Sequence, residues 1–234
     1  MKFKSTKDVA SERFVALVVG MSGIGKTTLA KTLPEPHEKT LIISAESGLL
    51  CLSGTDIPVY EVDPKETWQS LTEVFDYLST EEAKKKFTYL FIDSLTEIAQ
   101  LVLAELKRDP KLSDAKNGFL LWGQYADRMT KIIKVLRDFR PYSVVFTCLS
   151  STEKDGLELV DDFSMPGQSV KENLKAYFDL VLHYQVFTDD EGASHRKLIT
   201  DTSVSRLAKD RSGKLSAYEN ADLTEIIGKV LHGA

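Results

Sequence analysis

The stretch from Gly20 to Thr28 has the residue types and spacing that bind a chain of phosphates. It fits the pattern G-x-x-x-x-G-K-[ST] at every fixed position. Glycines allow backbone N–H groups to close around phosphate oxygens. Lys26 is placed to reach the β- and γ-phosphates, and the Thr27 hydroxyl to hold Mg²⁺. We therefore expect a nucleoside triphosphate and Mg²⁺ to bind here, through Gly20, Ser22, Gly23, Ile24, Gly25, Lys26, Thr27 and Thr28.

The segments on either side of this loop are those that such a site requires. Residues 14–19 form a continuous apolar run, which is typical of a strand buried on both faces. Residues 28–33 are predicted to form a helix that Pro34 and Pro36 end. A helix that starts at the loop directs its positive end toward the anion. The alternative, a flexible turn that opens a helix, explains fewer of these features.

Two acidic residues follow predicted strands and are candidates for the chemistry. Glu46 comes after the apolar residues 40–44, at the edge of the sheet where active sites of open α/β folds gather. It could polarise the attacking water, or it could equally be a carboxylate at a helix N-terminus. Asp93 ends the apolar residues 87–92 in the Walker B form, which holds Mg²⁺. Its alternative role is the N-cap of the following helix.

The second half of the chain contains further predicted elements. Residues 118–139 have a helical apolar pattern, and residues 143–148 form another strand. Residues 149–168 are expected to form a long polar loop, and residues 180–187 and 196–200 a β-hairpin. A basic turn with Lys209 and Arg211 comes next. A helix over residues 221–231 closes the chain.

Composition limits the class of protein. The 234 residues, of which 42% are hydrophobic and 28% charged, suit a single α/β domain over residues 1–234. The net charge of −5 argues against a protein that coats duplex DNA through bulk charge. No apolar run is long enough to span a bilayer, so we expect a soluble cytoplasmic protein. Cys51 and Cys148 are expected to be buried free thiols.

The combination of motifs resembles the RecA-like branch of P-loop ATPases. The features that carry the resemblance are the glycine loop, Glu46, the Asp93-Ser94 pair and the Lys209-Asp210-Arg211 turn. Within that branch the chain most resembles short phage nucleotide-binding proteins that keep only the RecA/RadA core, over about residues 13–215. The resemblance implies an α/β fold with a mainly parallel sheet between helices, extended by an antiparallel hairpin.

The resemblance also implies roles for individual residues. Glu46 would be the catalytic base, and Lys209 and Arg211 would reach the nucleotide of a neighbouring subunit in a homo-oligomer. From spacing alone, the last two residues would be a solvated basic turn. RecA-like proteins commonly place a polar pair as γ-phosphate sensor where this chain has Cys148-Leu149, which leaves Thr147 or Ser150 for that role.

The resulting prediction is a Mg²⁺-dependent ATPase coupled to single-stranded DNA binding and strand annealing in phage recombination, in the host cytoplasm. The segment that would contact DNA, residues 149–168, is acidic, and this departs from the expected pattern. The alternative is a nucleotide-gated assembly switch that hydrolyses slowly. A small-molecule kinase is disfavoured because residues 149–168 contain no arginine for a lid.

Overall fold

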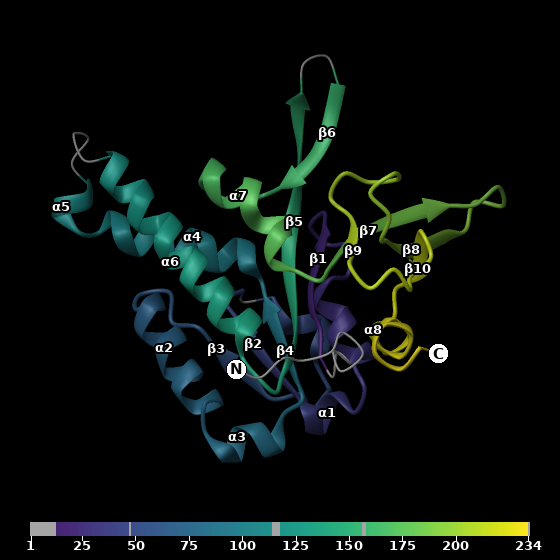
Figure 1. The fold of residues 1–234 in the computed structure, drawn as a ribbon, viewed down its shortest axis with the longest axis horizontal. Helices are drawn as coiled ribbons and strands as arrows, with labels where there is room; N and C mark the ends of the chain where they lie inside the picture. The colour runs from purple at the N-terminus through teal and green to yellow at the C-terminus, as the bar shows by residue number, and fades with distance from the viewer. Residues whose placement is uncertain (1–12, 47, 114–117, 156–157, 234) are drawn as a thin grey trace, which may run out of the picture.

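A mostly parallel β-sheet forms the middle layer of the computed structural model, which describes residues 13–46, 48–113, 118–155 and 158–233 (Figure 1). Its strand order is β10-β8-β7-β1-β5-β4-β2-β3, with β6 paired to β5 and β9 to β7. The strands are β1 (Val15–Gly20), β2 (Thr40–Ser44), β3 (Val59–Glu61), β4 (Tyr89–Asp93), β5 (Ser143–Asp155), β6 (Glu158–Phe163), β7 (Leu180–Thr188), β8 (Ser194–Ile199), β9 (Lys209–Asp210) and β10 (Tyr218–Asn220).

The parallel part of the sheet places the predicted site at one edge. β1 lies between β5 and β7, and β5, β4, β2 and β3 continue in parallel. All residues of β1 are buried, as expected for a strand covered on both faces. Because parallel strands end at the same edge, the residues after β1, β2 and β4 meet there, beside the middle of β5. The antiparallel pairs β7–β8 and β8–β10 extend the sheet on the other side. This confirms the predicted α/β class.

Helices cover both faces of the sheet. They are α1 (Pro36–Lys39), α2 (Thr67–Leu78), α3 (Glu81–Lys86), α4 (Leu95–Lys107), α5 (Pro110–Ser113), α6 (Gly118–Asp138), α7 (Gln168–Leu174) and α8 (Leu223–Ile227), which a π-helical turn, Gly228–His232, extends. Short 3-10 helices span Thr27–Thr32, Leu49–Leu52 and Lys175–Tyr177. The predicted helix over residues 118–139 therefore corresponds to α6, and the predicted hairpin to β7 and β8.

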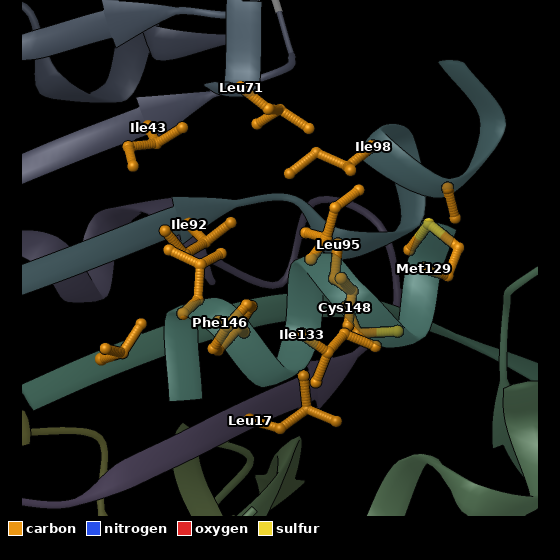
Figure 2. Packing of buried hydrophobic residues seen from close by; sticks show 14 of the residues in the cluster. Leu17, Ile43, Leu71, Ile92, Leu95, Ile98, Met129, Ile133, Phe146 and Cys148 are labelled. Atoms are coloured by element: carbon orange, nitrogen blue, oxygen red, sulfur yellow. The ribbon is translucent and has the colours of Figure 1, made fainter. Parts of the chain in front are cut away.

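The alternation of side chains along each strand divides the core into two clusters. Leu17, Ile92 and Phe146 face α2, α4, α6 and α7, where Figure 2 shows them beside Leu95 of α4 and Ile133 of α6. Their neighbours along each strand, such as Val18, Phe91 and Val145, face the opposite side of the sheet. The 3-10 helix after the glycine loop and α8 cover that side. This two-sided burial explains why the central strands contain continuous apolar runs.

The segment after the glycine loop differs from the predicted α-helix. Residues Thr27–Thr32 form a 3-10 helix instead, and Leu33 is already extended, with φ −69° and ψ 149°. Helical backbone angles are disfavoured for the residue before a proline. Pro34 therefore makes the helix end at Thr32, one residue earlier than predicted.

The prediction of a long loop over residues 149–168 was wrong. β5 continues to Asp155 and pairs antiparallel with β6, from Ser150 opposite Phe163 to Asp155 opposite Glu158. Figure 1 shows this β5–β6 hairpin rising beyond the edge of the sheet. A two-stranded ribbon with solvent around it needs no apolar face, so its sequence lacks the period that marks a core strand.

Two smaller expectations can be compared with the structure. Cys148 is buried as expected, but Cys51 is exposed because it lies on the surface 3-10 helix Leu49–Leu52. Within the described part of the chain, none of the helices combines the length and hydropathy needed to cross a bilayer.

Candidate nucleotide site

The glycine loop leaves β1 and turns in a conformation that requires glycine. Gly23 and Gly25 have φ of 74° and 107°, in the region that residues with a side chain rarely adopt. Gly20 is needed for a different reason, since a Cβ there would lie 2.8 Å from the carbonyl oxygen of Tyr184 on β7. The loop is therefore shaped by its own backbone and by the neighbouring strand.

Lys26 is buried inside this loop, with 7% of its surface exposed. Its Nζ donates hydrogen bonds to the carbonyl oxygens of Gly20 (2.9 Å) and Met21 (2.8 Å), and these contacts close the loop. Burial lowers the pKa of Lys26, and the nearby carboxylates of Glu46 and Asp93 oppose this effect. A desolvated cation held at the loop is suited to bind an anion such as a phosphate.

Asp93 joins three segments at the carboxyl edge of the sheet. Its Oδ2 accepts a hydrogen bond from Thr27 Oγ1 (2.8 Å), and its Oδ1 accepts one from Thr147 Oγ1 (2.6 Å). The carboxylate is almost fully buried. Burial raises the pKa of Asp93 above its ordinary value, while the hydrogen bonds from Thr147 and Thr27 lower it. The structure thus brings together Thr27 and Asp93, the two predicted metal ligands, and Thr147, one of the two predicted γ-phosphate sensors.

The donor atoms at Asp93 fit a magnesium ion. Mg²⁺ takes oxygen ligands in octahedral geometry, where neighbouring ligands about 2.1 Å from the metal lie roughly 3 Å from each other. The Thr27 hydroxyl and the Asp93 carboxylate oxygen are separated by 2.8 Å, close to that spacing. These two residues would hold the ion, and water and phosphate would complete its shell.

Glu46 lies beside the same edge, after β2. Ser94 Oγ donates a short hydrogen bond to Glu46 Oε1, and Ser44 Oγ donates one to the Glu46 backbone carbonyl (2.7 Å). The neighbouring Ala45 N–H donates to the carbonyl oxygen of Asp93 (2.7 Å). These contacts fix Glu46 next to the Asp93-Ser94 pair. Ser94 is also the N-cap of α4, so one hydroxyl serves the helix and the carboxylate together.

The second predicted sensor, Ser150, occupies a different place. It lines a cavity of about 360 Å³ between the tip of the glycine loop and β7. Ser150 is separated from Asp93 because side chains alternate along β5, where Thr147 faces one side of the sheet and Ser150 the other. Of the two candidates, only Thr147 contacts the predicted metal ligands.

Lys209 and Arg211 do not join the glycine loop of their own chain. Lys209 Nζ donates to the carbonyl oxygens of Lys175 (2.9 Å) and Phe178 (2.7 Å), and Arg211 pairs with Asp179 at 2.7 Å. Asp179 also accepts from the Val15 N–H, at the start of β1. The glycine loop follows the other end of β1, about 16 Å away along the strand. Within one chain, the basic turn and the glycine loop therefore lie at opposite ends of β1.

Sequence reasoning missed two contacts with the glycine loop. Arg196 on β8 donates through Nε to the carbonyl oxygen of Ile24 (3.0 Å), and Tyr184 on β7 packs beneath Gly20 and Gly25. These residues are far from the loop in sequence. The only signal in the sequence was that each lies in a strand of the predicted hairpin.

A comparison with protein families identifies the kind of domain that holds this site. The model of a family described as "AAA domain" matches residues 12–212, which is most of the chain. The chain belongs to the AAA domain family. The match extends over the glycine loop, Glu46, Asp93 and the basic turn, so these features belong to one P-loop ATPase-type domain.

This AAA domain was also compared with curated proteins and with solved structures. No match was found among curated proteins. Among solved structures, it is similar to the subject of "Structural and biochemical analysis of a prototypical ATPase from the type III secretion system of pathogenic bacteria", at 18% identity and a TM-score of 0.43. The similarity covers 76% of this chain and 51% of that chain, so the AAA domain spans about half the length of that protein.

The buried charge of Asp93 gives a first prediction, for Asp93→Asn. Because the pKa of Asp93 is raised in the folded state, the ionised carboxylate opposes folding, and stability rises as pH falls through that pKa. Asn removes the charge but keeps an acceptor. We expect the nucleotide-free variant to unfold at the wild-type temperature or above at pH 7. Mg²⁺ and ATP should raise the unfolding temperature of wild type by about 5–10 °C when ATP is at a hundredfold excess over its Kd. The variant should lose this rise.

Differential scanning calorimetry with and without Mg²⁺ and ATP measures both effects. Asp76→Asn, on the exposed surface of α2, is the matched control and should change neither. A marked loss of stability in nucleotide-free Asp93→Asn would show that the carboxylate serves the fold rather than a metal ion.

Proposed function

We propose that the protein binds ATP with Mg²⁺ and hydrolyses it. The observation that carries this proposal is the contact of Asp93 with Thr27 and Thr147, which places a buried carboxylate at the end of the phosphate-binding loop. Lys26 would bind the terminal phosphates, and the backbone N–H groups of the loop would hold the rest of the triphosphate. The metal ion, when bound, would neutralise charge that develops on the phosphates.

Glu46 is the proposed base for the attacking water. The Ser94 hydroxyl binds Oε1 and leaves Oε2 to accept a proton or orient a water molecule. The side chain is half-buried at the same edge as Asp93 and Lys26, so it is close to the phosphates without being one of the metal ligands. Positioning of water and phosphate is the main contribution that a protein makes to phosphoryl transfer.

Glu46→Gln tests this role. The amide retains the size of the side chain but cannot take a proton, so we expect ATP affinity close to wild type and turnover slower by a factor of about 10² to 10⁴. Phosphate release under steady-state conditions and equilibrium ATP binding measure the two quantities. Glu38→Gln, on exposed α1, is the control and should hydrolyse normally. Normal turnover in Glu46→Gln would return Glu46 to a structural role.

We further propose that a homo-oligomer completes the site. Lys209 and Arg211 lie at the amino-terminal edge of β7, opposite to the nucleotide edge. A head-to-tail arrangement would bring this edge of one subunit to the nucleotide edge of the next. There, Arg211 could exchange its ion pair with Asp179 for the charge of the γ-phosphate and stabilise the transition state.

A mixing experiment tests the contribution in trans. Arg211→Ala alone should bind ATP normally but hydrolyse it about 10³-fold more slowly. Glu46→Gln alone should also be inactive, although its Arg211 is intact. If the arginine acts in trans, mixing the two inactive variants should restore part of the turnover, because some Arg211→Ala sites receive the arginine of a Glu46→Gln neighbour. No recovery, in a mixture shown by light scattering to exchange subunits, would contradict the proposal.

The proposal has two candidates for the use of the ATP cycle. Single-stranded DNA binding and strand annealing in phage recombination rest on the resemblance described above. One observation favours the alternative, a nucleotide-gated assembly switch. The β5–β6 hairpin, which lies beside the site, carries Glu153, Asp161 and Asp162, and Lys171 of α7 pairs with only the first and third of these (2.6 and 2.9 Å). Remaining negative charge suits a protein partner better than phosphates.

A salt-titrated binding assay separates these functions. A recombinase should bind a fluorescent single-stranded oligonucleotide more tightly with ATP than without, with an affinity that falls steeply as salt increases. Double-stranded DNA of the same sequence is the control. Absence of binding at 50 mM salt with ATP would exclude the recombination role and leave the switch.

A further inference from the structure

The amino-terminal edge of the sheet, opposite the glycine loop, carries a cluster of positive charge. We call this cluster the basic patch, and its cations are Arg13, Lys134, Arg137, Arg140, Lys209 and Arg211. Two carboxylates pair with it, Asp138 with Arg137 and Asp179 with Arg211. Asp210 instead accepts hydrogen bonds from backbone N–H groups of its own turn. Positive charge is therefore in excess at this edge, although the chain as a whole has a net charge of −5.

Close contacts hold the cations of the basic patch together. Arg13 Nη1 donates to the Arg137 carbonyl oxygen (2.6 Å), and Lys134 Nζ lies 5.9 Å from the centre of the Tyr177 ring. Burial lowers the pKa of Arg13 and the positive charge of Arg140 lowers it further, while the two carboxylates of the patch oppose this effect. Within the described part of the chain, neither Lys134 nor Arg140 is paired with a carboxylate, and both are exposed. An anionic surface would therefore bind favourably here.

The β5–β6 hairpin at the opposite edge has the complementary charge. Its residues 153–162 contain one lysine, Lys154, and the acidic residues Glu153, Asp155, Glu158, Asp161 and Asp162. Lys171 of α7 pairs with one acidic residue on each strand and so attaches the hairpin to the domain. The two lysines together leave a net negative charge on the hairpin. Figure 1 shows that the hairpin projects from the sheet, where another molecule can reach it.

The two charged surfaces lie at opposite ends of the same strand. Arg140 comes just before β5 and Asp155 ends it, and the 13 residues of β5 extend roughly 40 Å. The hairpin of one molecule therefore cannot contact its own basic patch. A second copy stacked with its β5 in the same direction brings its basic patch to the hairpin of the first.

We propose that the acidic β5–β6 hairpin of one subunit binds the basic patch of the next. The inference rests on the proposed homo-oligomer and names the surfaces that join its subunits. It also leaves Arg211 for the nucleotide. The cations beside β5 lie at the end of α6 and before β5, whereas Arg211 follows β9, which pairs with β7. Because β1 lies between β5 and β7, one side of the patch faces the neighbour's hairpin and the other side faces its glycine loop.

The distribution of charge in the patch favours this protein partner over a nucleic acid. Asp138 and Asp179 lie among the cations, where they would repel a phosphate backbone. The hairpin has Lys154 among its carboxylates, so both surfaces mix the two signs of charge with opposite excess. Such complementary mixtures are typical of contacts between proteins and determine how the two surfaces align.

Charge reversal on either surface tests the contact. Lys134→Glu/Arg140→Glu on the patch should weaken self-association by roughly tenfold or more, because like charges then face each other. Asp155→Lys/Glu158→Lys, at the last paired positions of the hairpin, should do the same. Sedimentation velocity with Mg²⁺ and ATP over a range of protein concentrations measures the association. Lys107→Glu, at an exposed position on α4, is the matched control and should assemble as wild type does.

A mixture of the two reversed variants makes the test specific to this pair of surfaces. The reversed patch and the reversed hairpin are again opposite in charge, so the mixture should associate more tightly than either variant alone. No recovery in the mixture, with both variants folded by circular dichroism, would reject the pairing. Assembly of the patch variant at wild-type strength would also reject it. If that variant assembled normally but lost binding of a single-stranded oligonucleotide, the patch would be a nucleic-acid surface instead.

Failure of this inference is distinguishable from failure of the proposed nucleotide site. If wild type bound ATP with Mg²⁺ but stayed monomeric at every concentration, the nucleotide site would stand, and the homo-oligomer and this contact would both be rejected. If wild type bound no ATP but the mixture of reversed variants recovered assembly, the contact would stand and the ATPase function would be rejected.

Discussion

The burial of the Asp93 carboxylate is the constraint on which the site depends. An ionised carboxylate removed from water costs several kcal/mol unless other groups compensate for the lost hydration. Two threonine hydroxyls, from the 3-10 helix after the loop and from β5, provide that compensation in part. Each such hydrogen bond to a charged group contributes about 1.5–3 kcal/mol. Under the proposed function, the remaining charge would favour a bound metal ion, and the same two hydrogen bonds align three segments of the chain.

The parallel sheet explains why these segments meet. β1, β2 and β4 end at one edge, beside the middle of β5, so the glycine loop, Glu46, Asp93 and Thr147 converge although they are widely separated in sequence. The same geometry places Lys209 and Arg211 at the opposite edge, where Asp179 and backbone carbonyl oxygens hold them. The chain therefore has the proposed nucleotide site at one edge of the sheet and a basic turn at the other. This arrangement is compatible with a ring or filament in which unlike edges meet.

The β5–β6 hairpin connects this edge with the exterior. Lys171 pairs with Glu153 and Asp162, one residue on each strand of the hairpin, and so attaches it to α7. Asp161 lies 3.7 Å from the ring of His183, at the margin of the cavity beside the loop. Burial lowers the pKa of His183, so the ring is neutral at pH 7 and attracts Asp161 only weakly. The hairpin thus has two ion pairs with α7 on one side and a single weak contact with His183 on the other.

The sequence by itself determined the glycine loop, the buried strands and the acidic residues that end them. These are local features, since the loop conformation needs Gly23 and Gly25, and strands covered on both faces need apolar runs. The sequence also predicted Lys26, Thr27 and Asp93 as one site, because their motifs have fixed chemical roles. It did not predict the β5–β6 hairpin, whose polar strands have no apolar period.

Only the tertiary structure decided which distant side chains meet. Thr147 and Ser150 were equivalent candidates in the sequence, and strand pleating placed only Thr147 on Asp93. Arg196 and Tyr184 reach the glycine loop because β7 and β8 lie beside β1, a strand order that no local pattern encodes. The sequence also left the position of Lys209 and Arg211 open. The pairing of β9 with β7 places them at the edge of the sheet opposite the glycine loop. Local chemistry fixes the loop and the elements, and only the packing of those elements fixes the distances between their side chains.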